Sequence, residues 1–322
     1  MPAYKKSDAR AYCRENMKGI WAAIPYPFDD KDRIDEDAFR ADIRHFIDDL
    51  GIKGFFVGGL IGEFWCLTKE ERLRGQEIAC EEAGEVPIIA HTGHTSAKEA
   101  VELTNAAAEA GAAYAILGNP YLGASGIPER VRAFFSYVCA RTDLGVSLFN
   151  FGGSGYLMSP ELIGQIVDEN ENICCVKNAG PKYHCDEVRE AVGDEIVVTD
   201  PAETQWFFNR AYHKQQTFMS SPDPFLYQRT GNLGMQRYTN LIDEGNLEEA
   251  WTAREAMNPI RRVADKWLWK PWSLGAFPIP ALKTWMDLMG MTGGPSRPPM
   301  VPLSSAERED LAGDLRSVGL ID

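Results

Sequence analysis

The sequence predicts an α/β protein, a (β/α)8 barrel followed by a C-terminal helical domain. Over the first two thirds of the 322 residues, short apolar runs alternate with amphipathic stretches of roughly a dozen residues, which is typical of βα units on a parallel sheet. From about residue 233 the strand signals stop and the pattern becomes helical. We therefore expect an N-terminal segment over residues 1–18, the barrel over 19–232 and the helical domain over 233–322.

Eight apolar runs are expected to form the strands, because each is short and a helical pattern separates it from the next. Eight strands with intervening helices indicate a closed barrel. An open, doubly wound sheet has the same periodicity and is the alternative. In chain order the strands are Gly19–Ile24, Gly54–Gly58, Val86–Ala90, Ala112–Leu117, Gly145–Phe149, Ile173–Lys177, Ile196–Thr199 and Thr217–Ser220.

Several helix ends carry recognisable signals. Thr68-x-x-Glu71 and Ser96-x-x-Glu99 predict capping boxes, in which each side chain accepts the other residue's backbone N–H. Ser159-Pro160 predicts an N-cap, and Gly111 predicts the left-handed residue that ends a helix. Three C-terminal helices are expected, at Leu247–Met257, Ile279–Met289 and Ser305–Val318.

An aromatic segment, Trp267-Leu268-Trp269-Lys270-Pro271-Trp272, lies between the first two of these C-terminal helices. It has two interpretations. The segment packs against the barrel or forms a subunit interface, or else it forms a wall of the substrate pocket.

Composition and charge exclude several classes of protein. Apolar residues make up 44% and charged residues 25% of the chain, the balance of an ordinary globular protein. A formal charge of −14 argues against binding to nucleic acid or to an anionic membrane. No apolar run reaches the roughly 18 to 20 residues of a membrane span. Seven scattered cysteines without a Cys-x-x-Cys pair predict reduced thiols. We expect a cytoplasmic protein without nucleic-acid or membrane partners.

Lys177 is the most informative candidate for chemistry. It closes the apolar run Ile173–Val176 at the carboxyl end of a strand, where barrels of this kind place their active sites. Lowering a lysine pKa from about 10.4 to about 7.5 takes roughly 4 kcal/mol of desolvation and charge repulsion. The neutral amine can then form a Schiff base, an electron sink for C–C or C–O cleavage. A structural lysine paired with Glu63 or Asp200 is the alternative.

The chain also carries a series of short motifs at characteristic intervals. They are Ala23–Asp29, Gly54–Phe64, Leu67–Arg72, His91–Gly93, Asn119–Tyr121, Leu148–Asn150, Val176–Asn178 and Gly294–Pro299. Singly each motif is common, but in this order they resemble the dihydrodipicolinate synthase / N-acetylneuraminate lyase family of Schiff-base aldolases and dehydratases. The resemblance extends from Gly19 to the C-terminus. It implies a TIM barrel with a C-terminal helical domain, a homotetramer or homodimer, and no metal or organic cofactor.

The resemblance further implies a class I carbon–carbon or carbon–oxygen lyase with Lys177 as the Schiff-base lysine. Its substrate would be pyruvate, another 2-oxo acid or a related carbonyl compound. Phe64, Trp65, Phe149 and Phe151, together with the loss of hydroxyl residues, favour a larger, partly hydrophobic or aromatic substrate. Such a substrate resembles that of the hydratase-aldolase branch, which cleaves arylidene-pyruvates. The aromatic side chains have a second interpretation, in which they only fill the barrel.

The chain departs from the family pattern where the family transfers protons. Two adjacent hydroxyl residues of the family are replaced by Leu60 and Ile61, and the proton-shuttling tyrosine is replaced by Phe149. Leu122 stands where the family has a second tyrosine, and Ser154 lies near the place of the synthase branch's arginine. Because phenylalanine cannot transfer a proton, the usual relay cannot run through position 149. These changes disfavour lysine biosynthesis.

Two residues are expected to replace the missing relay. Tyr26 closes the first strand and is a candidate proton carrier, with a packing role as the alternative. His91 follows the third strand, near His94, where an imidazole can titrate near neutral pH. Its alternative is hydrogen bonding within the loop. Weaker candidates for the relay are Tyr156, Glu63 and Asp200.

Substrate binding is expected to use backbone donors and apolar walls more than arginine. The N–H groups of the Gly59–Gly62 turn could still hold a carboxylate. The expected substrate-binding residues are Gly59, Leu60, Ile61, Phe149, Asn150 and Ser220.

Two rival functions remain open on the sequence. A non-catalytic protein that binds carbonyl metabolites could keep the barrel after losing the relay. A metal-dependent aldolase could use His91, His94 and Glu63 as ligands.

Overall fold

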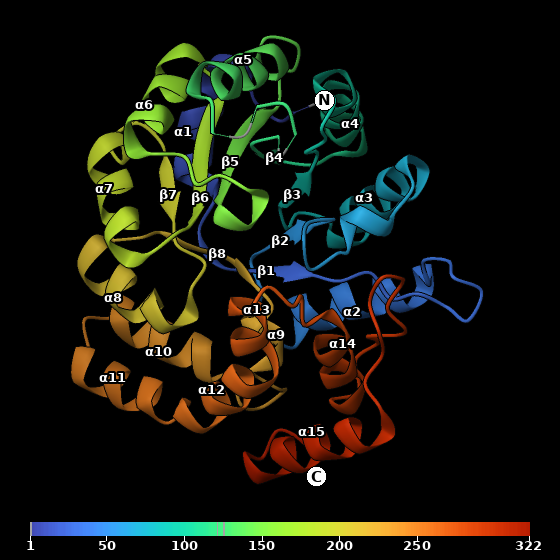
Figure 1. The fold of residues 1–322 in the computed structure, drawn as a ribbon. Helices are drawn as coiled ribbons and strands as arrows, with labels where there is room; N and C mark the ends of the chain where they lie inside the picture. The colour runs from blue at the N-terminus through green and yellow to red at the C-terminus, as the bar shows by residue number, and fades with distance from the viewer. Residues whose placement is uncertain (1, 121, 125) are drawn as a thin grey trace.

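The protein is a (β/α)8 barrel with C-terminal helices, as predicted (Figure 1). The computed structural model describes residues 2–120, 122–124 and 126–322. Eight parallel strands pair in the order β7-β6-β5-β4-β3-β2-β1-β8. The strands are β1 Gly19–Ile24, β2 Gly54–Val57, β3 Ile88–His91, β4 Tyr114–Gly118, β5 Gly145–Phe151, β6 Ile173–Ala179, β7 Val197–Thr199 and β8 Thr217–Ser221.

Side chains from β7 help to close the barrel against β8. The hydroxyl of Thr199 lies 3.2 Å from the carbonyl oxygens of Thr217 and Met219, and it accepts the N–H of Met219 at 3.1 Å. Gln215 adds a bond from its amide to the Thr217 carbonyl at 2.9 Å. The expected alternative of an open, doubly wound sheet is therefore wrong, because the strands follow one another in chain order, β8 pairs with β1, and the Thr199 bonds bridge the remaining junction between β7 and β8.

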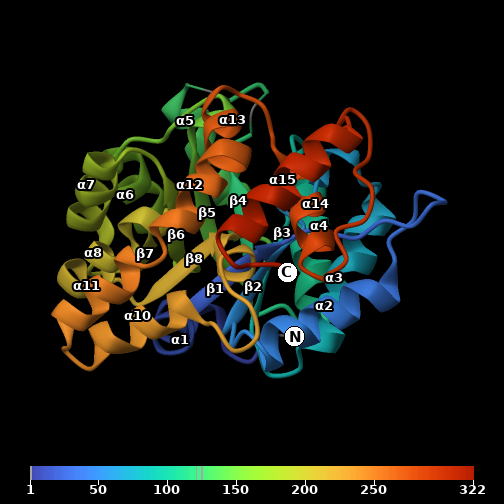
Figure 2. The same cartoon turned by 90° about the horizontal axis from the view of Figure 1, so that it is seen from below.

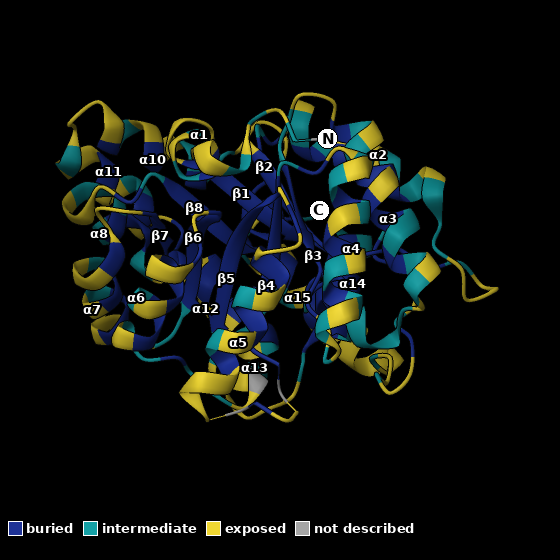
Figure 3. Cartoon of the chain, turned by 90° about the horizontal axis from the view of Figure 1, so that it is seen from above, coloured by how far each residue is buried: buried dark blue, intermediate teal, exposed yellow. Residues whose placement is uncertain are grey.

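Seven helices cover the outside of the barrel, and Figure 3 shows their outward faces exposed while the strands inside are buried. The Thr68 capping box is present in full. The Ser96 box is present only in half: Ser96 accepts the Glu99 N–H, but the Glu99 carboxylate pairs with Lys69 at 2.8 Å instead. The helices are α2 Glu36–Asp48, α3 Lys69–Ala83, α4 Ala97–Ala110, α5 Pro128–Cys139, α6 Pro160–Glu169, α7 Lys182–Val192 and α8 Glu203–His213.

The N-terminal segment covers the end of the barrel where the strands begin. Its helix α1, Ala9–Asn16, follows a short 3-10 turn, η1 Lys6–Asp8. Arg10 donates to the carbonyl of Ile173 at the start of β6, and Gln216 beside β8 donates to the Met17 carbonyl. The opposite end of the barrel therefore stays available for a site.

The C-terminal helices lie along one side of the barrel and reach over its mouth (Figures 1 and 2). α10 and α11 pack beside α8, where Trp206 donates to Thr239 and Arg254 donates to the Thr204 carbonyl. None of the helices among the described residues is long and apolar enough to cross a membrane. The elements are α9 Asp223–Leu226, α10 Gly234–Asp243, α11 Leu247–Glu255, α12 Asn258–Ala264, the π-helix η4 Asp265–Trp269, α13 Lys270–Ser273, α14 Ile279–Leu288 and α15 Ser305–Ser317.

Candidate active site

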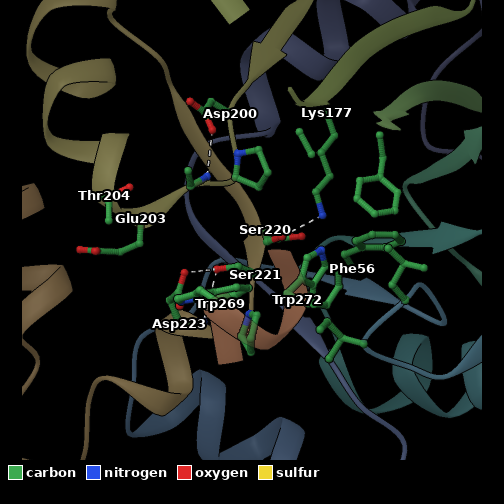
Figure 4. Close-up of a pocket in the computed structure, with 18 of the residues that line it drawn as sticks. Phe56, Lys177, Asp200, Glu203, Thr204, Ser220, Ser221, Asp223, Trp269 and Trp272 are labelled. Atoms are coloured by element: carbon green, nitrogen blue, oxygen red, sulfur yellow. Dashed lines mark hydrogen bonds between the residues drawn. The ribbon is translucent and has the colours of Figure 1, made fainter. Parts of the chain in front are cut away.

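A cavity of about 430 Å³ opens at the carboxyl ends of the strands (Figure 4). Strand ends supply one part of its wall, including Lys177 from β6 and Ser220 from β8. Trp269 and Trp272, from η4 and α13, supply another part. Of the two interpretations of the aromatic segment, these two tryptophans therefore fit the second, a wall of the pocket. Trp267 instead donates to Asp314 on α15 at 2.7 Å.

Lys177 is buried in the wall of this cavity. Its Nζ donates to the Ser220 carbonyl at 2.8 Å and lies 4.6 Å and 4.8 Å from the ring centres of Phe56 and Phe149. Burial lowers the pKa of Lys177 to about 7. A large share of the amine is therefore neutral and nucleophilic near neutral pH.

The carboxylates expected as partners of Lys177 are bound elsewhere. Glu63 forms an ion pair with Lys283 at 2.6 Å, and both side chains are 1% exposed. Asp200 accepts the N–H of Ala202 and the amide of Asn209. Because no described carboxylate forms an ion pair with Lys177, its interpretation as a paired structural lysine is not supported.

The pKa of Lys177 predicts how its reaction with a carbonyl depends on pH. The neutral amine is the reactive form, so the rate of borohydride-trapped adduct formation with pyruvate should rise about tenfold per pH unit below 7 and level off above it. An unperturbed lysine would keep gaining reactivity up to about pH 10. Quantifying the adduct by intact-protein mass spectrometry between pH 5 and pH 10 gives the profile. A plateau reached only near pH 10 would contradict the assignment.

The turn after β2 contributes two of the three expected residues. Leu60 and Ile61 line the cavity, and no described residue accepts a hydrogen bond from either backbone N–H. Gly59 does not line it: a Cβ there would lie 2.4 Å from the Phe56 ring, so this glycine allows close packing against Phe56. The expected role of Gly59 in substrate contact is therefore corrected to one in shaping the turn.

Phe149 and Asn150 point to opposite sides of β5, as neighbours on a strand must. Phe149 lines the cavity and stacks on Phe151 at 5.6 Å between ring centres. Asn150 is fully buried outside the cavity lining, where its amide bonds to the backbone of Met158 and to Asn178 at 2.7 Å. Asn150 is therefore a structural residue, contrary to expectation.

Ser220 lines the cavity, and its part in substrate binding stays a prediction. Its carbonyl holds Lys177, and its hydroxyl is buried without a hydrogen-bond partner among the described residues. A hydroxyl in this position can meet an oxygen on the carbon that the lysine attacks.

Tyr26, one of the two expected proton carriers, lies outside the cavity. Its ring is buried edge-on against Phe39 at 5.0 Å, and Gly75 of α3 allows its close approach. Burial raises the pKa of Tyr26 further above its usual value. The alternative of a packing tyrosine therefore holds.

His91 lies in a neighbouring cavity of about 460 Å³, which shares Leu60, Phe149 and Phe151 with the first. Its Nδ1 is 3.3 Å from the Arg72 guanidinium. Burial and the positive charge of Arg72 hold the pKa of His91 well below its usual value. The imidazole is therefore neutral at physiological pH and a poor proton carrier.

The metal-site hypothesis finds no matching geometry. The described part of the chain contains no cluster of three or more His, Cys, Asp or Glu side chains that could hold a metal ion. Glu63 is bound to Lys283, and His94 Nδ1 accepts the N–H of Ser96.

Two residues follow the fourth strand where the family has tyrosines. Tyr121 lies outside the described residues, and Leu122 is exposed.

Several lining residues were not anticipated, and Asp223 is the most notable. It is 1% exposed, lines the cavity, and its Oδ2 accepts the Ser221 hydroxyl at 2.6 Å. Its Oδ1 has no hydrogen-bond partner among the described residues. Burial raises the pKa of Asp223 to about 7, and the negative charge of Glu203 contributes. The position of Asp223, two residues after β8, is the signal that could have revealed it.

An arginine also lines the cavity, but it is fully engaged. Arg261 of α12 binds Glu203 through two nitrogens, at 2.6 Å and 2.7 Å. Its third nitrogen donates to the Arg254 carbonyl and to Asn258. Arg261 therefore serves the internal ion pair, and its guanidinium is not available as a clamp for a substrate carboxylate.

Comparison with known proteins identifies relatives along nearly the whole chain. The profile of the Dihydrodipicolinate synthetase family matches residues 16–318. The 4-hydroxy-tetrahydrodipicolinate synthase of Pelobacter propionicus is 28% identical over 311 residues, which cover 95% of this chain and 100% of that protein. That of Maridesulfovibrio salexigens is 29% identical over 312 residues, with 95% and 99% covered.

Solved structures share the fold. YagE from Escherichia coli K12, described in complex with pyruvate, superposes with a TM-score of 0.82 at 22% identity, over 94% of this chain and 99% of that one. The dihydrodipicolinate synthase of Aquifex aeolicus superposes with a TM-score of 0.81 at 23% identity, over 94% and 98%.

Proposed function

The chain belongs to the dihydrodipicolinate synthetase family of class I Schiff-base lyases and aldolases, and on that premise we propose that Lys177 forms an imine with a 2-oxo acid such as pyruvate. The observation that carries this proposal is the buried amine of Lys177, which has a pKa of about 7, no described carboxylate partner and a position on the cavity wall. The description of the related YagE with pyruvate supports the choice of ligand.

The groups around Lys177 can bind the carboxylate and the C2 carbonyl of a 2-oxo acid. The N–H groups of Leu60 and Ile61, which donate to no described residue, form a donor pair for the carboxylate, the role that the family's hydroxyl residues would otherwise take. The Ser220 hydroxyl can bond the oxygen at C2 while the amine adds to that carbon. Loss of water then gives the protonated imine, which withdraws electrons from the bond next to C2.

The remaining part of the cavity favours an uncharged, partly aromatic extension of the substrate. Phe56, Phe149, Phe151, Trp269 and Trp272 present ring surfaces to it. Arg261 is held by Glu203, so the described lining offers no unpaired arginine to a second carboxylate. We therefore propose that the lyase makes or breaks the carbon–carbon bond that joins the pyruvate unit to the aryl-bearing carbon of an arylidene-pyruvate or a similar aryl-substituted 2-oxo acid.

The proposed activity can be followed by absorbance and NMR. Wild-type protein incubated with benzylidene-pyruvate should add water across its C=C bond and then cleave the resulting C–C bond, which releases pyruvate and benzaldehyde, with the same rate in excess EDTA. A rise in melting temperature without any chemical change over hours would instead indicate a non-catalytic carbonyl-binding protein. Loss of turnover in EDTA, restored by a divalent cation, would indicate a metal-dependent aldolase.

A further inference from the structure

The turn after β2, residues 58–64, contains a buried glutamate in an uncommon backbone conformation. Glu63 has a φ of +52°, in the left-handed region that residues other than glycine rarely adopt. Its side chain is buried but does not line the cavity. A residue keeps such a conformation only where the surrounding structure holds it there. The contacts of Glu63 therefore show what fixes the shape of this turn.

Backbone bonds within the turn orient the two N–H groups of the donor pair. The Glu63 N–H donates to the Leu60 carbonyl at 3.1 Å. The Phe64 N–H donates to the Gly59 carbonyl at 3.3 Å. In a trans peptide unit the C=O and N–H lie in one plane and point in opposite directions. Because the Leu60 carbonyl shares its peptide unit with the Ile61 N–H, and the Gly59 carbonyl shares its unit with the next N–H, the two bonds fix the direction of both donors.

The carboxylate of Glu63 is held by the C-terminal part of the chain. Its Oε1 forms an ion pair with Lys283 of α14 at 2.6 Å, and its Oε2 accepts the Arg297 N–H at 3.4 Å. Lys283 also donates to the Pro295 carbonyl at 2.9 Å. Both ends of this contact are buried, so water does not compete for the carboxylate.

Arg297 belongs to a strap, residues 290–299, that follows α14 and contains the motif at residues 294–299. Its guanidinium binds Glu71 of α3 through two nitrogens, at 2.8 Å and 2.6 Å, and pairs with Asp32 at 2.7 Å. These bonds attach the strap to the barrel independently of the turn after β2. The strap and α14 therefore give Glu63 an anchor that does not move with the turn.

We propose that Glu63 is a positioning residue for substrate binding, an inference that rests on the proposed imine at Lys177. The ion pair with Lys283 holds Glu63, and its backbone in turn holds the donor pair that binds the carboxylate of the 2-oxo acid. The C-terminal part of the chain thus raises the affinity for substrate without touching it. The Lys177 amine is bound to Ser220 and lies outside this network, so its addition to a carbonyl without a carboxylate does not depend on Glu63.

Pyruvate and acetone separate positioning from stability, because acetone forms the same imine but has no carboxylate. For each compound, the concentration that gives half-maximal borohydride trapping on Lys177 is measured by mass spectrometry. The wild-type protein should need less pyruvate than acetone. In Glu63→Gln combined with Lys283→Met, we expect the pyruvate value to rise about tenfold or more and the acetone value to stay within about twofold, since only the charged ligand uses the donor pair.

Asp42→Asn is the matched control. Asp42 is a buried carboxyl on α2 that accepts the Thr292 N–H at 3.1 Å, so it holds the strap but makes no contact with the turn after β2. Its variant should show wild-type values for both compounds. Glu63→Gln alone keeps the size of the side chain and provides a second route, in which the pyruvate value should shift in the same direction. Melting temperatures show that each variant is folded.

The outcomes distinguish this inference from the proposed function. Pyruvate values of the Glu63 variants within about twofold of wild type overturn the positioning role. An equal rise for pyruvate and acetone also overturns it and indicates a purely structural pair. A wild-type protein that traps acetone as readily as pyruvate overturns carboxylate binding at the turn, and with it this inference, while the imine stands. Absence of any Lys177 adduct in wild-type protein overturns the proposed function itself.

Discussion

Replacing Lys177 with methionine is expected to abolish adduct formation and to lower turnover at least about 10³-fold, because the nucleophile that becomes part of the intermediate is gone. Methionine keeps much of the length and all of the apolar stem, so the packing against Phe56 and Phe149 should survive. Lys177→Arg should fail equally, since a guanidinium stays protonated at every accessible pH. Steady-state kinetics and borohydride trapping measure the two effects.

Lys182→Met is the control for the loss of a lysine as such. Lys182 begins α7, is exposed and pairs with Asp186 at 2.8 Å, outside the cavity. Its variant should keep wild-type turnover and the full adduct. Turnover by Lys177→Met above a tenth of the wild-type rate would show that another group carries the reaction.

The second large effect concerns stability and the ion pair between Glu63 and Lys283. Lys283→Met is expected to lower the free energy of unfolding by about 3 to 5 kcal/mol, because it leaves the Glu63 carboxylate buried without its cation. Lys283 also donates to the Pro295 carbonyl at 2.9 Å, so it ties α14 and the following loop to the turn after β2. Burial lowers the pKa of Lys283 even beside Glu63. Urea unfolding measures the change.

A double variant isolates the charge from the packing. Glu63→Gln combined with Lys283→Met removes both charges and should recover most of the stability lost in Lys283→Met alone. If Lys283→Met lowers the free energy of unfolding by less than about 1 kcal/mol, the ion pair is not desolvated as its burial implies.

The barrel could be predicted from the sequence because its strands are buried on both faces. Such strands read as short, continuous apolar runs, and each of the eight predicted runs overlaps an observed strand. Lys177 stood out for the same reason, since a charge at the end of an apolar run is physically conspicuous. Errors at strand ends are small, such as β6 continuing to Ala179.

The direction of side chains was harder to predict than the strands. Asn150 lies one residue before the end of β5 and Tyr26 two residues after β1, but the Asn150 side chain bonds to Asn178 outside the cavity lining and Tyr26 packs against α3. Alternation along β5 could have separated Phe149 from Asn150, because the register pairs Phe149 with Lys177 and Asn150 with Asn178.

The far wall of the cavity could not be predicted from local pattern. Trp269, Trp272 and Arg261 reach the mouth of the barrel through helices that follow β8 by more than 30 residues. Their positions depend on how α12, η4 and α13 dock. The lining does contain an arginine, but Arg261 is engaged by Glu203. That arginine plays little part in substrate binding stays a prediction.

The measurement that tests the central claim most directly is the site of covalent trapping. Wild-type protein is incubated with pyruvate and separately with benzylidene-pyruvate, reduced with borohydride, digested and mapped by tandem mass spectrometry. We predict one modified lysine, Lys177, carrying the reduced adduct of the 2-oxo acid. Modification of other lysines with Lys177 unmodified, or no adduct with either compound, would contradict the assignment of Lys177 as the Schiff-base residue.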